Sequence, residues 1–220
     1  MEQFENIKLY NADCMDVMRT FKDKQFDLAI VDPPYFKYVA NGTFYGGGVA
    51  KNGVKRLSSK SKTWDENIPN QEYYKEVVRV SKNQIVWGIN YFDFTDVPHG
   101  RIVWDKINDS STFSNCEIAS CSLFYGVRIY REIWNGMIKS EPQKRIHPTQ
   151  KPVALYKWLL QKYAKQADTI LDTHFGSLSI GIACHDMGFD LTAIELDKEY
   201  YEKAKQRLIW HQQQQVLFKP

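Results

Sequence analysis

The chain lacks the sequence features of disulfide-linked, metal-binding and membrane-spanning proteins. Its five histidines are scattered and form no ligand cluster, so we expect no metal site. No apolar run is long enough to cross a bilayer, and the first residues do not resemble a signal peptide. We therefore expect a cytoplasmic protein with reduced thiols. No Cys-x-x-Cys pair occurs among its four cysteines, which are Cys14, Cys116, Cys121 and Cys184.

Acidic residues are absent from residues 37–63. This stretch carries six positive charges against a net charge of +3 for the whole chain, so the remainder is net acidic by about three charges. It is rich in glycine and serine and has no hydrophobic periodicity, which predicts a flexible basic loop. Such a loop can clamp phosphates, and a solvated loop without a ligand is the alternative. We favour the clamp, because a long structureless loop in a compact domain is usually functional or disordered. The candidate phosphate ligands are Lys51, Lys55, Arg56 and Lys60.

The hydrophobic pattern that is present is typical of an α/β protein. The chain has 220 residues, 43% hydrophobic and 25% charged, which suits one domain over residues 1–220. Short apolar runs alternate with segments whose apolar residues recur at helical spacing, and this predicts a doubly wound, mostly parallel, Rossmann-like sheet. We expect seven strands, at residues 7–10, 26–31, 84–89, 101–104, 116–125, 169–172 and 190–194.

A short motif, Asp32-Pro33-Pro34-Tyr35, ends the second of these strands. Two consecutive prolines can neither continue a strand ladder nor enter a helix interior. The motif therefore places a carboxylate, a free Pro33 carbonyl and an aromatic face at the carboxyl end of a strand, where open α/β sheets bind ligands. These groups suit a flat base held by its exocyclic amine. A strand-ending turn with a solvated aspartate and a packed tyrosine is the alternative.

A second pattern near the end of the chain predicts a nucleotide-binding half. A strand, a turn containing Gly176, a helix and another strand lead to Glu195, which follows Gly176 by 19 residues. An acidic residue at this position can reach a ribose diol. No Walker lysine follows the turn, so we do not expect a triphosphate. Earlier in the chain, Asp13 lies at a strand-to-helix junction, where it fits a helix cap or an acceptor for a ligand amine.

Residues 106–146 are more irregular. A strand is expected to end at Gly126, and basic residues then alternate with aromatic ones, including Arg128 and Arg131. This mixture suits a nucleic-acid surface, and it equally suits the irregular edge of any domain. We interpret the segment as an inserted target-recognition region.

Three motifs together resemble the S-adenosylmethionine-dependent DNA amino-methyltransferases, and the resemblance covers about Leu9 to Leu208. The order, with the catalytic motif before the cofactor motif, resembles the permuted beta class of mainly N6-adenine and some N4-cytosine enzymes. The small size and this form of the cofactor loop resemble phage and prophage adenine methyltransferases. The motifs are Asp32-Pro33-Pro34-Tyr35, His147-Pro148-Thr149-Gln150-Lys151-Pro152 and Leu171-Asp172-Thr173-His174-Phe175-Gly176-Ser177.

The resemblance implies a role for each motif. The first motif, Asp32 to Tyr35, would hold a flipped base next to the cofactor, and Asp32 is assigned to both sites. Glu195 would bind the cofactor's ribose, and Asp13 and Cys14 would lie beside its adenine. Thr149 and Lys151 would approach its carboxylate. Its methionine end would be held by Asp172 and the Phe175-Gly176-Ser177 turn, and His174 is assigned to the cofactor site as well.

The implied activity is methyl transfer from S-adenosylmethionine to the N6 amine of adenine in double-stranded DNA, with base flipping. Asp rather than Ser before Pro-Pro-Tyr favours adenine by family usage, and an N4-cytosine enzyme is the first alternative. A protein-glutamine or RNA amino-methyltransferase stays open, as does homodimer formation. The chain has no Pro-Cys dipeptide, which argues against a cytosine-C5 enzyme.

One position departs from the family pattern. The family usually has glycine where Leu178 stands. A leucine there opposes a positive φ and is expected to bring bulk to the cofactor's approach. A catalytically weak DNA-binding relic is therefore a further alternative.

Overall fold

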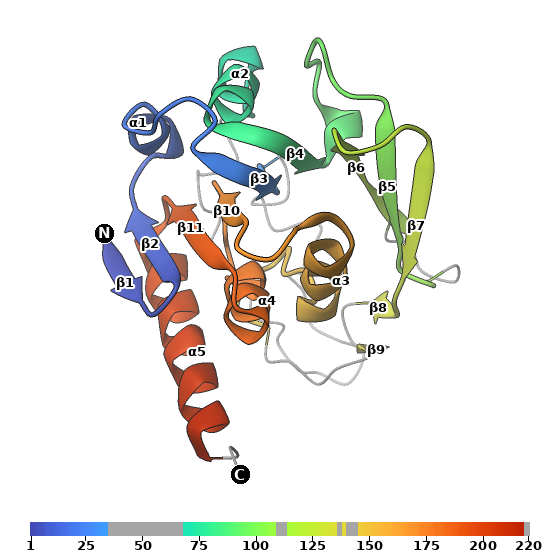
Figure 1. The fold of residues 1–220 in the computed structure, drawn as a ribbon. Helices are drawn as coiled ribbons and strands as arrows, with labels where there is room; N and C mark the ends of the chain where they lie inside the picture. Colours follow the sequence, from blue (N-terminus) through green and yellow to red (C-terminus); the bar gives the residue numbers. More distant parts are fainter. Residues whose placement is uncertain (35–67, 109–113, 136–137, 140–144, 218–220) are drawn as a thin grey trace, which may run out of the picture.

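The computed structural model describes residues 1–34, 68–108, 114–135, 138–139 and 145–217, and a mixed sheet runs through its middle (Figure 1). The sheet has nine strands in the order β1-β2-β11-β10-β3-β4-β6-β5-β7, and β8 and β9 form a separate pair. The α/β fold class is confirmed. The strands are β1 Glu2–Phe4, β2 Ile7–Asn11, β3 Phe26–Val31, β4 Ser81–Trp87, β5 Gly100–Asp105, β6 Cys116–Cys121, β7 Val127–Arg131, β8 Trp134–Asn135, β9 Ile138–Lys139, β10 Thr169–Asp172 and β11 Asp190–Glu195.

All seven predicted strands occur, and two edge strands, β1 and β7, extend the sheet beyond the predicted seven. β1 has only three residues, too few to show a period. β7 is mostly exposed, so its sequence lacks the apolar alternation of a half-buried strand. β6 ends at Cys121, earlier than the predicted residue 125, and the chain turns through Gly126 at a φ of 89°.

The direction of the strands decides which residues meet. Strands β2, β11, β10, β3 and β4 are all parallel. β6 is antiparallel to both β4 and β5, so β5 and its parallel neighbour β7 again run in the direction of β4. The carboxyl ends of the parallel strands and the amino end of β6 therefore meet at one side of the sheet, which we call the ligand edge.

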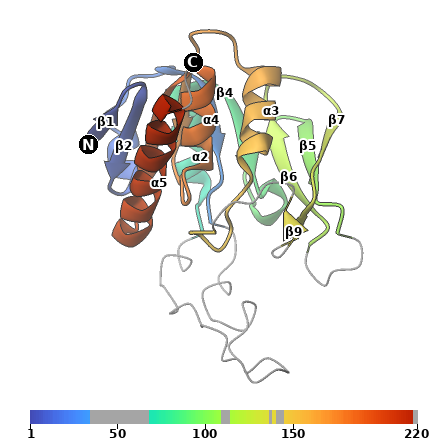
Figure 2. The same cartoon turned by 90° about the horizontal axis from the view of Figure 1, so that it is seen from below.

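Helices cover both faces of the central strands. Figure 1 shows α1 (Cys14–Met18) and α2 (Gln71–Val80) on one face, and α3 (Val153–Tyr163), α4 (Ser179–Met187) and α5 (Lys198–Leu217) on the other. In Figure 2 the three helices of the second group lie side by side. A short 3-10 helix, Ile89–Tyr91, follows β4. Burial on both faces explains the continuous apolar run of β3, of which Leu28 to Val31 are buried.

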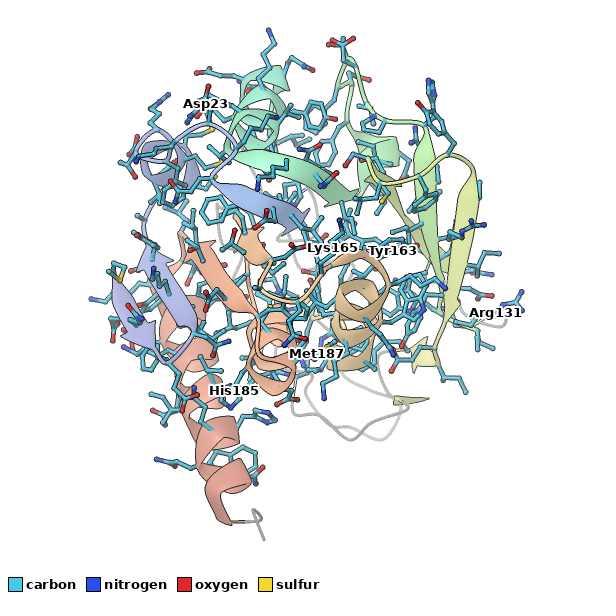
Figure 3. The ribbon with its side chains drawn as sticks, viewed as in Figure 1. Asp23, Arg131, Tyr163, Lys165, His185 and Met187 are labelled. Atoms are coloured by element: carbon cyan, nitrogen blue, oxygen red, sulfur yellow. The ribbon has the colours of Figure 1, made fainter. Side chains whose placement is uncertain are left out.

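One arginine joins the elements on the first face. The Arg79 guanidinium donates hydrogen bonds to the backbone carbonyls of Met18 (2.8 Å) and Phe21 (2.9 Å). It also pairs with Glu76 at 2.8 Å and with Asp23 at 2.7 Å, and Figure 3 labels Asp23 at this junction. Arg79 thus ties α2 to the segment that connects α1 with β3.

Among the described residues, no helix is long and apolar enough to cross a bilayer. The same residues contain no group of three or more histidine, cysteine, aspartate or glutamate side chains placed to hold a metal ion. All four cysteines are free thiols.

Candidate active site

Three predicted carboxyl residues lie at the ligand edge, on three neighbouring strands. Asp32 directly follows β3, Asp172 ends β10 and Glu195 ends β11. These strands are adjacent and parallel, so their carboxyl ends lie together. The structure thus brings the two halves of the predicted site, Asp32 and the Gly176 turn, to the same edge of the sheet.

The turn after β10 is held by the end of β11. Gly176 N donates to Glu195 Oε2 at 2.9 Å, and His174 N donates to Asp172 Oδ1 at 3.0 Å. Gly176 has a φ of 49°, and a Cβ added there would lie 3.3 Å from three ring atoms of His147. The second and third predicted motifs therefore meet at Gly176, where a side chain would push the His147 ring away.

Leu178 adopts the strained backbone expected of it. It caps α4 in the left-handed conformation, with φ 57° and ψ 33°. Its side chain, however, is fully buried in the apolar core. A Cβ added to Gly181 would lie 2.6 Å from Leu178 Cγ, so the leucine covers the bare backbone of α4 one turn later. The expected bulk is thus directed into the core under α4.

Asp13 is a helix cap, as the first reading of its position suggested. It precedes α1, and its Oδ1 accepts a hydrogen bond from Met15 N at 2.7 Å. The neighbouring Cys14 Sγ lies 3.7 Å from His174 Nε2. Burial raises the pKa of Cys14 to about 12 and lowers the pKa of His174 to about 4, so both side chains are neutral near pH 7.

His174 continues this contact towards α2. Its Nδ1 lies 2.9 Å from Thr173 Oγ1, which lies 2.7 Å from the Tyr73 hydroxyl. Tyr73 also packs edge-on against the His174 ring at 5.4 Å. Tyr73 belongs to none of the three motifs, and the structure places it beside the Gly176 turn.

Asp32 is held by a chain of alternating charges in which Lys151 is buried and the other side chains are partly buried. The Lys151 ammonium binds Asp32 Oδ2 on one side and Glu117 Oε2, at 2.9 Å, on the other. Lys106 in turn pairs with Glu117 Oε1 at 2.6 Å. The Lys151 side chain is only 2% exposed. Asp32 Oδ1 is buried and has no hydrogen-bond partner among the described residues.

Two tryptophan rings accompany the two lysines. The Lys151 ammonium lies 5.5 Å from the centre of the Trp87 ring, and the Lys106 ammonium lies 5.1 Å from that of Trp104. Both rings are fully buried or nearly so. An ammonium over an aromatic face is attracted by the ring quadrupole, so the rings help to compensate the desolvation of the lysines.

The carboxyl groups of the site differ in their ionisation. Burial raises the pKa of Asp32, an effect that Lys151 opposes and Glu117 reinforces. Burial also penalises the Glu117 carboxylate, but Lys151 and Lys106 outweigh it and bring its pKa to about 2. Burial raises the pKa of Asp172 to about 8 and that of Glu195 to about 7, against backbone hydrogen bonds that lower both.

Thr149 of the second motif and the two basic candidates, Arg128 and Arg131, lie in the described part of the chain. Thr149 is exposed, and its Oγ1 lies 3.1 Å from His147 Nδ1. Arg131 ends β7 on the ligand edge, where it pairs with Asp105 at 3.1 Å. Figure 3 labels it beside β7, the last strand of the sheet. Arg128 is exposed on the same strand, 5.5 Å from the Phe124 ring centre.

Several predicted residues lie outside the described part of the chain. They are Tyr35, Lys51, Lys55, Arg56, Lys60 and the predicted loop 37–63 as a whole. The predicted recognition segment 106–146 lies partly within the described part of the chain, and it contributes β6 and β7 to the central sheet. Its role in recognition stays a prediction.

Glu117 and Lys106 are the site residues that sequence analysis missed. Glu117 is the only charged residue of β6, and that isolation within an apolar strand is a signal that could have marked it. Its proximity to Asp32 depends on the position of β6 in the sheet, which the sequence does not reveal.

Sequence comparison finds similarity to DNA methyltransferases. Residues 126–206 match the N6/N4 methyltransferase family model, described as DNA methylase. The type II methyltransferase M2.LlaDCHI of Lactococcus lactis subsp. cremoris is 23% identical over 251 aligned residues, which cover 93% of this chain and 90% of that protein. The type II methyltransferase M2.MboI of Moraxella bovis is 26% identical, and the alignment covers 92% of this chain and 88% of that protein.

Solved structures share the fold. The M1.HpyAVI-SAM complex aligns with a TM-score of 0.60 and 22% identity, over 92% of this chain and all of that one. The PvuII DNA methyltransferase, described as cytosine-N4-specific, aligns with a TM-score of 0.58 and 11% identity, over 93% of this chain and 87% of that one.

Proposed function

We propose that this chain, a relative of the S-adenosylmethionine-dependent DNA amino-methyltransferases, methylates the N6 amine of adenine in double-stranded DNA. The observation that carries the proposal is Asp32: one of its oxygens is fixed by Lys151, and the other is buried and has no partner among the described residues. A buried acceptor without a donor is costly in a folded protein, so it requires an explanation, and a role in a functional site is one. An exocyclic amine would provide the missing donor.

The cofactor half fits an adenosyl sulfonium. The Asp172 and Glu195 carboxyls flank the Gly176 turn, where backbone approaches so closely that a Cβ would contact His147. Burial keeps both carboxyls partly protonated, and a nearby cation or ribose hydroxyls would favour their ionised forms. When bound, S-adenosylmethionine supplies an electrophilic methyl group on a sulfonium. We assign the turn to its methionine end and Glu195 to its ribose.

The base half would act by orienting a weak nucleophile. An exocyclic amine donates its lone pair into the ring, so it reacts poorly unless its hydrogens are held. Asp32 Oδ1 and the Pro33 carbonyl can each accept one of these hydrogens, which favours a pyramidal nitrogen with its lone pair free. Preorganised acceptors of this kind commonly provide the largest single contribution to catalysis. Transfer would break the methyl–sulfur bond of the sulfonium as the carbon–nitrogen bond forms, and a neutral thioether would leave. One amine proton would also leave, and Asp32 is the carboxylate placed to take it.

The target base must leave the duplex, since a paired amine is buried in the stack. The adenine assignment rests on Asp rather than Ser before Pro-Pro-Tyr. The N4 amine of cytosine suits the same two acceptors, and a cytosine-N4-specific enzyme shares the fold, so this base is the second candidate. Membership of the beta class and a phage origin stay predictions.

The test is transfer of labelled methyl groups from S-adenosylmethionine to duplex DNA of mixed sequence, followed by nucleoside digestion and mass spectrometry. N6-methyladenine is the expected product, and N4-methylcytosine would transfer the assignment to the second base. Asp32→Asn should abolish transfer while leaving cofactor binding, measured by calorimetry, unchanged.

A matched control is Asp27→Asn. Asp27 lies on the same strand, β3, at its amino end, and its carboxylate also pairs with a lysine, Lys82, at 2.6 Å. This control should keep its activity. Normal turnover by Asp32→Asn would contradict the proposed role of Asp32, and the absence of any methylated base with the wild-type protein would contradict the proposed function.

A further inference from the structure

The position of Glu117 follows from the strand order. β6 is inserted between β4 and β5 and is antiparallel to both, so its first residues lie where β4 ends. Ala119 is paired with Trp87, the last residue of β4, and Gly88 N donates to Ile118 O at 2.9 Å. Glu117 therefore reaches the ligand edge just beyond β4, although it belongs to a strand that runs away from that edge.

We propose that Glu117 is a positioning residue for Asp32: held by Lys106 through its other oxygen, the glutamate draws the Lys151 ammonium to one side, so that Asp32 is bound through Oδ2 alone and keeps Oδ1 for the substrate amine. The inference rests on the proposed amino-methyl transfer. It adds two residues, from β6 and from the end of β5, that none of the three motifs contains.

The geometry supports a shared ammonium rather than a simple ion pair. Lys151 binds one oxygen of each carboxylate, and Lys106 binds the second oxygen of Glu117. Without Glu117, Lys151 would have only Asp32 as a carboxylate partner, and a single ammonium can bridge both oxygens of one carboxylate. Such a bridge would occupy the acceptor that the amine requires.

Charge supports the same conclusion. The two carboxylates and two ammonium groups together are neutral, which lowers the cost of burying each of them. The glutamate also opposes the effect of Lys151 on Asp32, since Glu117 raises the pKa of Asp32 whereas Lys151 and Lys106 lower it. Removing Glu117 would therefore make Asp32 a weaker proton acceptor as well as a less accessible one.

The other titratable groups near Asp32 come from three further elements. Asp172 lies at the end of β10, Tyr73 on α2 and Tyr156 on α3, and each interacts electrostatically with Asp32. Burial raises the pKa of both tyrosines well above the ordinary value, so neither ionises in the working range. Asp172 titrates near pH 8 and is unchanged in the variants below, so it shifts all pH profiles alike.

The experiment compares Glu117→Gln and Lys106→Met with the wild type and with Asp27→Asn. Glu117→Gln keeps the shape of the side chain and removes its charge. We expect kcat to fall roughly 10- to 100-fold, with the KM for S-adenosylmethionine changed by less than about threefold. The acid limb of the kcat profile should move to lower pH in Glu117→Gln and to higher pH in Lys106→Met, by about 0.5–1 unit in each case.

Opposite shifts distinguish positioning from general destabilisation. A structural role alone would lower the thermal midpoint of both variants, as in Asp27→Asn, and would leave the acid limb in place. Shifts of the same sign, or none, would overturn the proposal. Glu117→Gln with wild-type kcat would overturn it as well. If Glu117→Gln does not fold, the upward shift in Lys106→Met decides the outcome.

A second readout separates this proposal from the proposed function. Carbon-13 NMR of side-chain-labelled aspartate follows the Asp32 carboxyl directly, and Asp32→Asn identifies its signal. The titration midpoint should fall in Glu117→Gln and rise in Lys106→Met, whether or not DNA is methylated. An inactive wild type with these midpoint shifts would contradict the methyl-transfer function and support the effect of Glu117. An active wild type with unmoved midpoints would contradict only the role of Glu117.

Discussion

Leu178 and Gly181 should be energetically coupled, because each makes the other tolerable. Leu178 occupies a left-handed conformation that disfavours any residue with a Cβ by roughly 1–2 kcal/mol. Its fully buried side chain lies where a Cβ on Gly181 would be, 2.6 Å from Leu178 Cγ and 2.7 Å from Cδ1. The perturbation is a double-mutant cycle of Leu178→Gly and Gly181→Ala.

The magnitudes follow from four contributions: backbone strain, leucine burial, helix propensity and steric clash. Leu178→Gly relieves roughly 1–2 kcal/mol of backbone strain but removes a buried leucine, at a cost of about 2–5 kcal/mol. The free energy of unfolding should therefore fall by about 2 kcal/mol, the middle of the resulting range. Gly181→Ala gains about 1 kcal/mol of helix propensity and loses about 1–3 kcal/mol through the clash. With Leu178 replaced, the same alanine should instead stabilise by about 1 kcal/mol. The expected coupling free energy is thus about 2 kcal/mol.

The assay is urea denaturation of the wild type, the two single variants and the double variant. Calorimetric titration with S-adenosylmethionine, run in parallel, shows whether the turn before α4 keeps its shape. Free-energy changes that add within about 0.5 kcal/mol would show that the two side chains do not interact, and would refute the packing described for Leu178. A stabilised Leu178→Gly variant would show that strain outweighs burial at this position.

Two further predictions concern stability. Burial raises the pKa of Asp172 from its ordinary 3.8 to about 8, so the folded state holds a proton that the unfolded state releases between about pH 4 and pH 8. The contribution of Asp172 to the free energy of unfolding should fall as pH rises through that window, by up to about 1.4 kcal/mol per pH unit. In urea titrations at several pH values, Asp172→Asn should remove this contribution and leave the smaller slope of Glu195, whose pKa burial raises to about 7. Arg79→Met should lower the free energy of unfolding by about 2 kcal/mol, because two backbone carbonyls lose their hydrogen-bond donor. Arg79→Lys should restore little of this stability, because an ammonium lacks the planar fork of the guanidinium. A pH slope that is unchanged in Asp172→Asn would contradict the raised pKa of Asp172. Full recovery of the free energy of unfolding in Arg79→Lys would contradict the role of the planar guanidinium.

The central strands could be predicted because they are buried on both faces. β3 and β10 appear in the sequence as uninterrupted apolar runs that end at Asp32 and Asp172, so both the fold class and two site carboxyls follow from the residues themselves. The cap at Asp13 was equally local, since a side chain that bonds the backbone two residues later depends on no distant contact.

The edges of the sheet and the surroundings of Asp32 could not be predicted in the same way. β1 is too short and β7 too exposed to show a hydrophobic period. The pairing of Glu117 with Lys151 depends on β6 lying between β4 and β5 in the sheet. In the sequence, however, β5 comes directly after β4, and β6 follows it. Hydrophobic pattern identifies a strand but not its neighbours, so the contact of Lys151 with Asp32 could not be predicted.

The two halves of the site differ in how their carboxyl groups are neutralised. Around Asp32, two lysines neutralise two carboxylates, so the free oxygen can accept from an uncharged amine without a large net charge in a buried place. Asp172 and Glu195 have no ion pair among the described residues, and burial raises the pKa of both. A neutral ligand would leave that second pair partly protonated, whereas a cationic ligand would be bound more tightly as the pair ionises. The same sheet edge therefore favours a neutral nucleophile beside β3 and a positively charged donor beside β10 and β11, which is the charge arrangement that methyl transfer from a sulfonium to an amine requires.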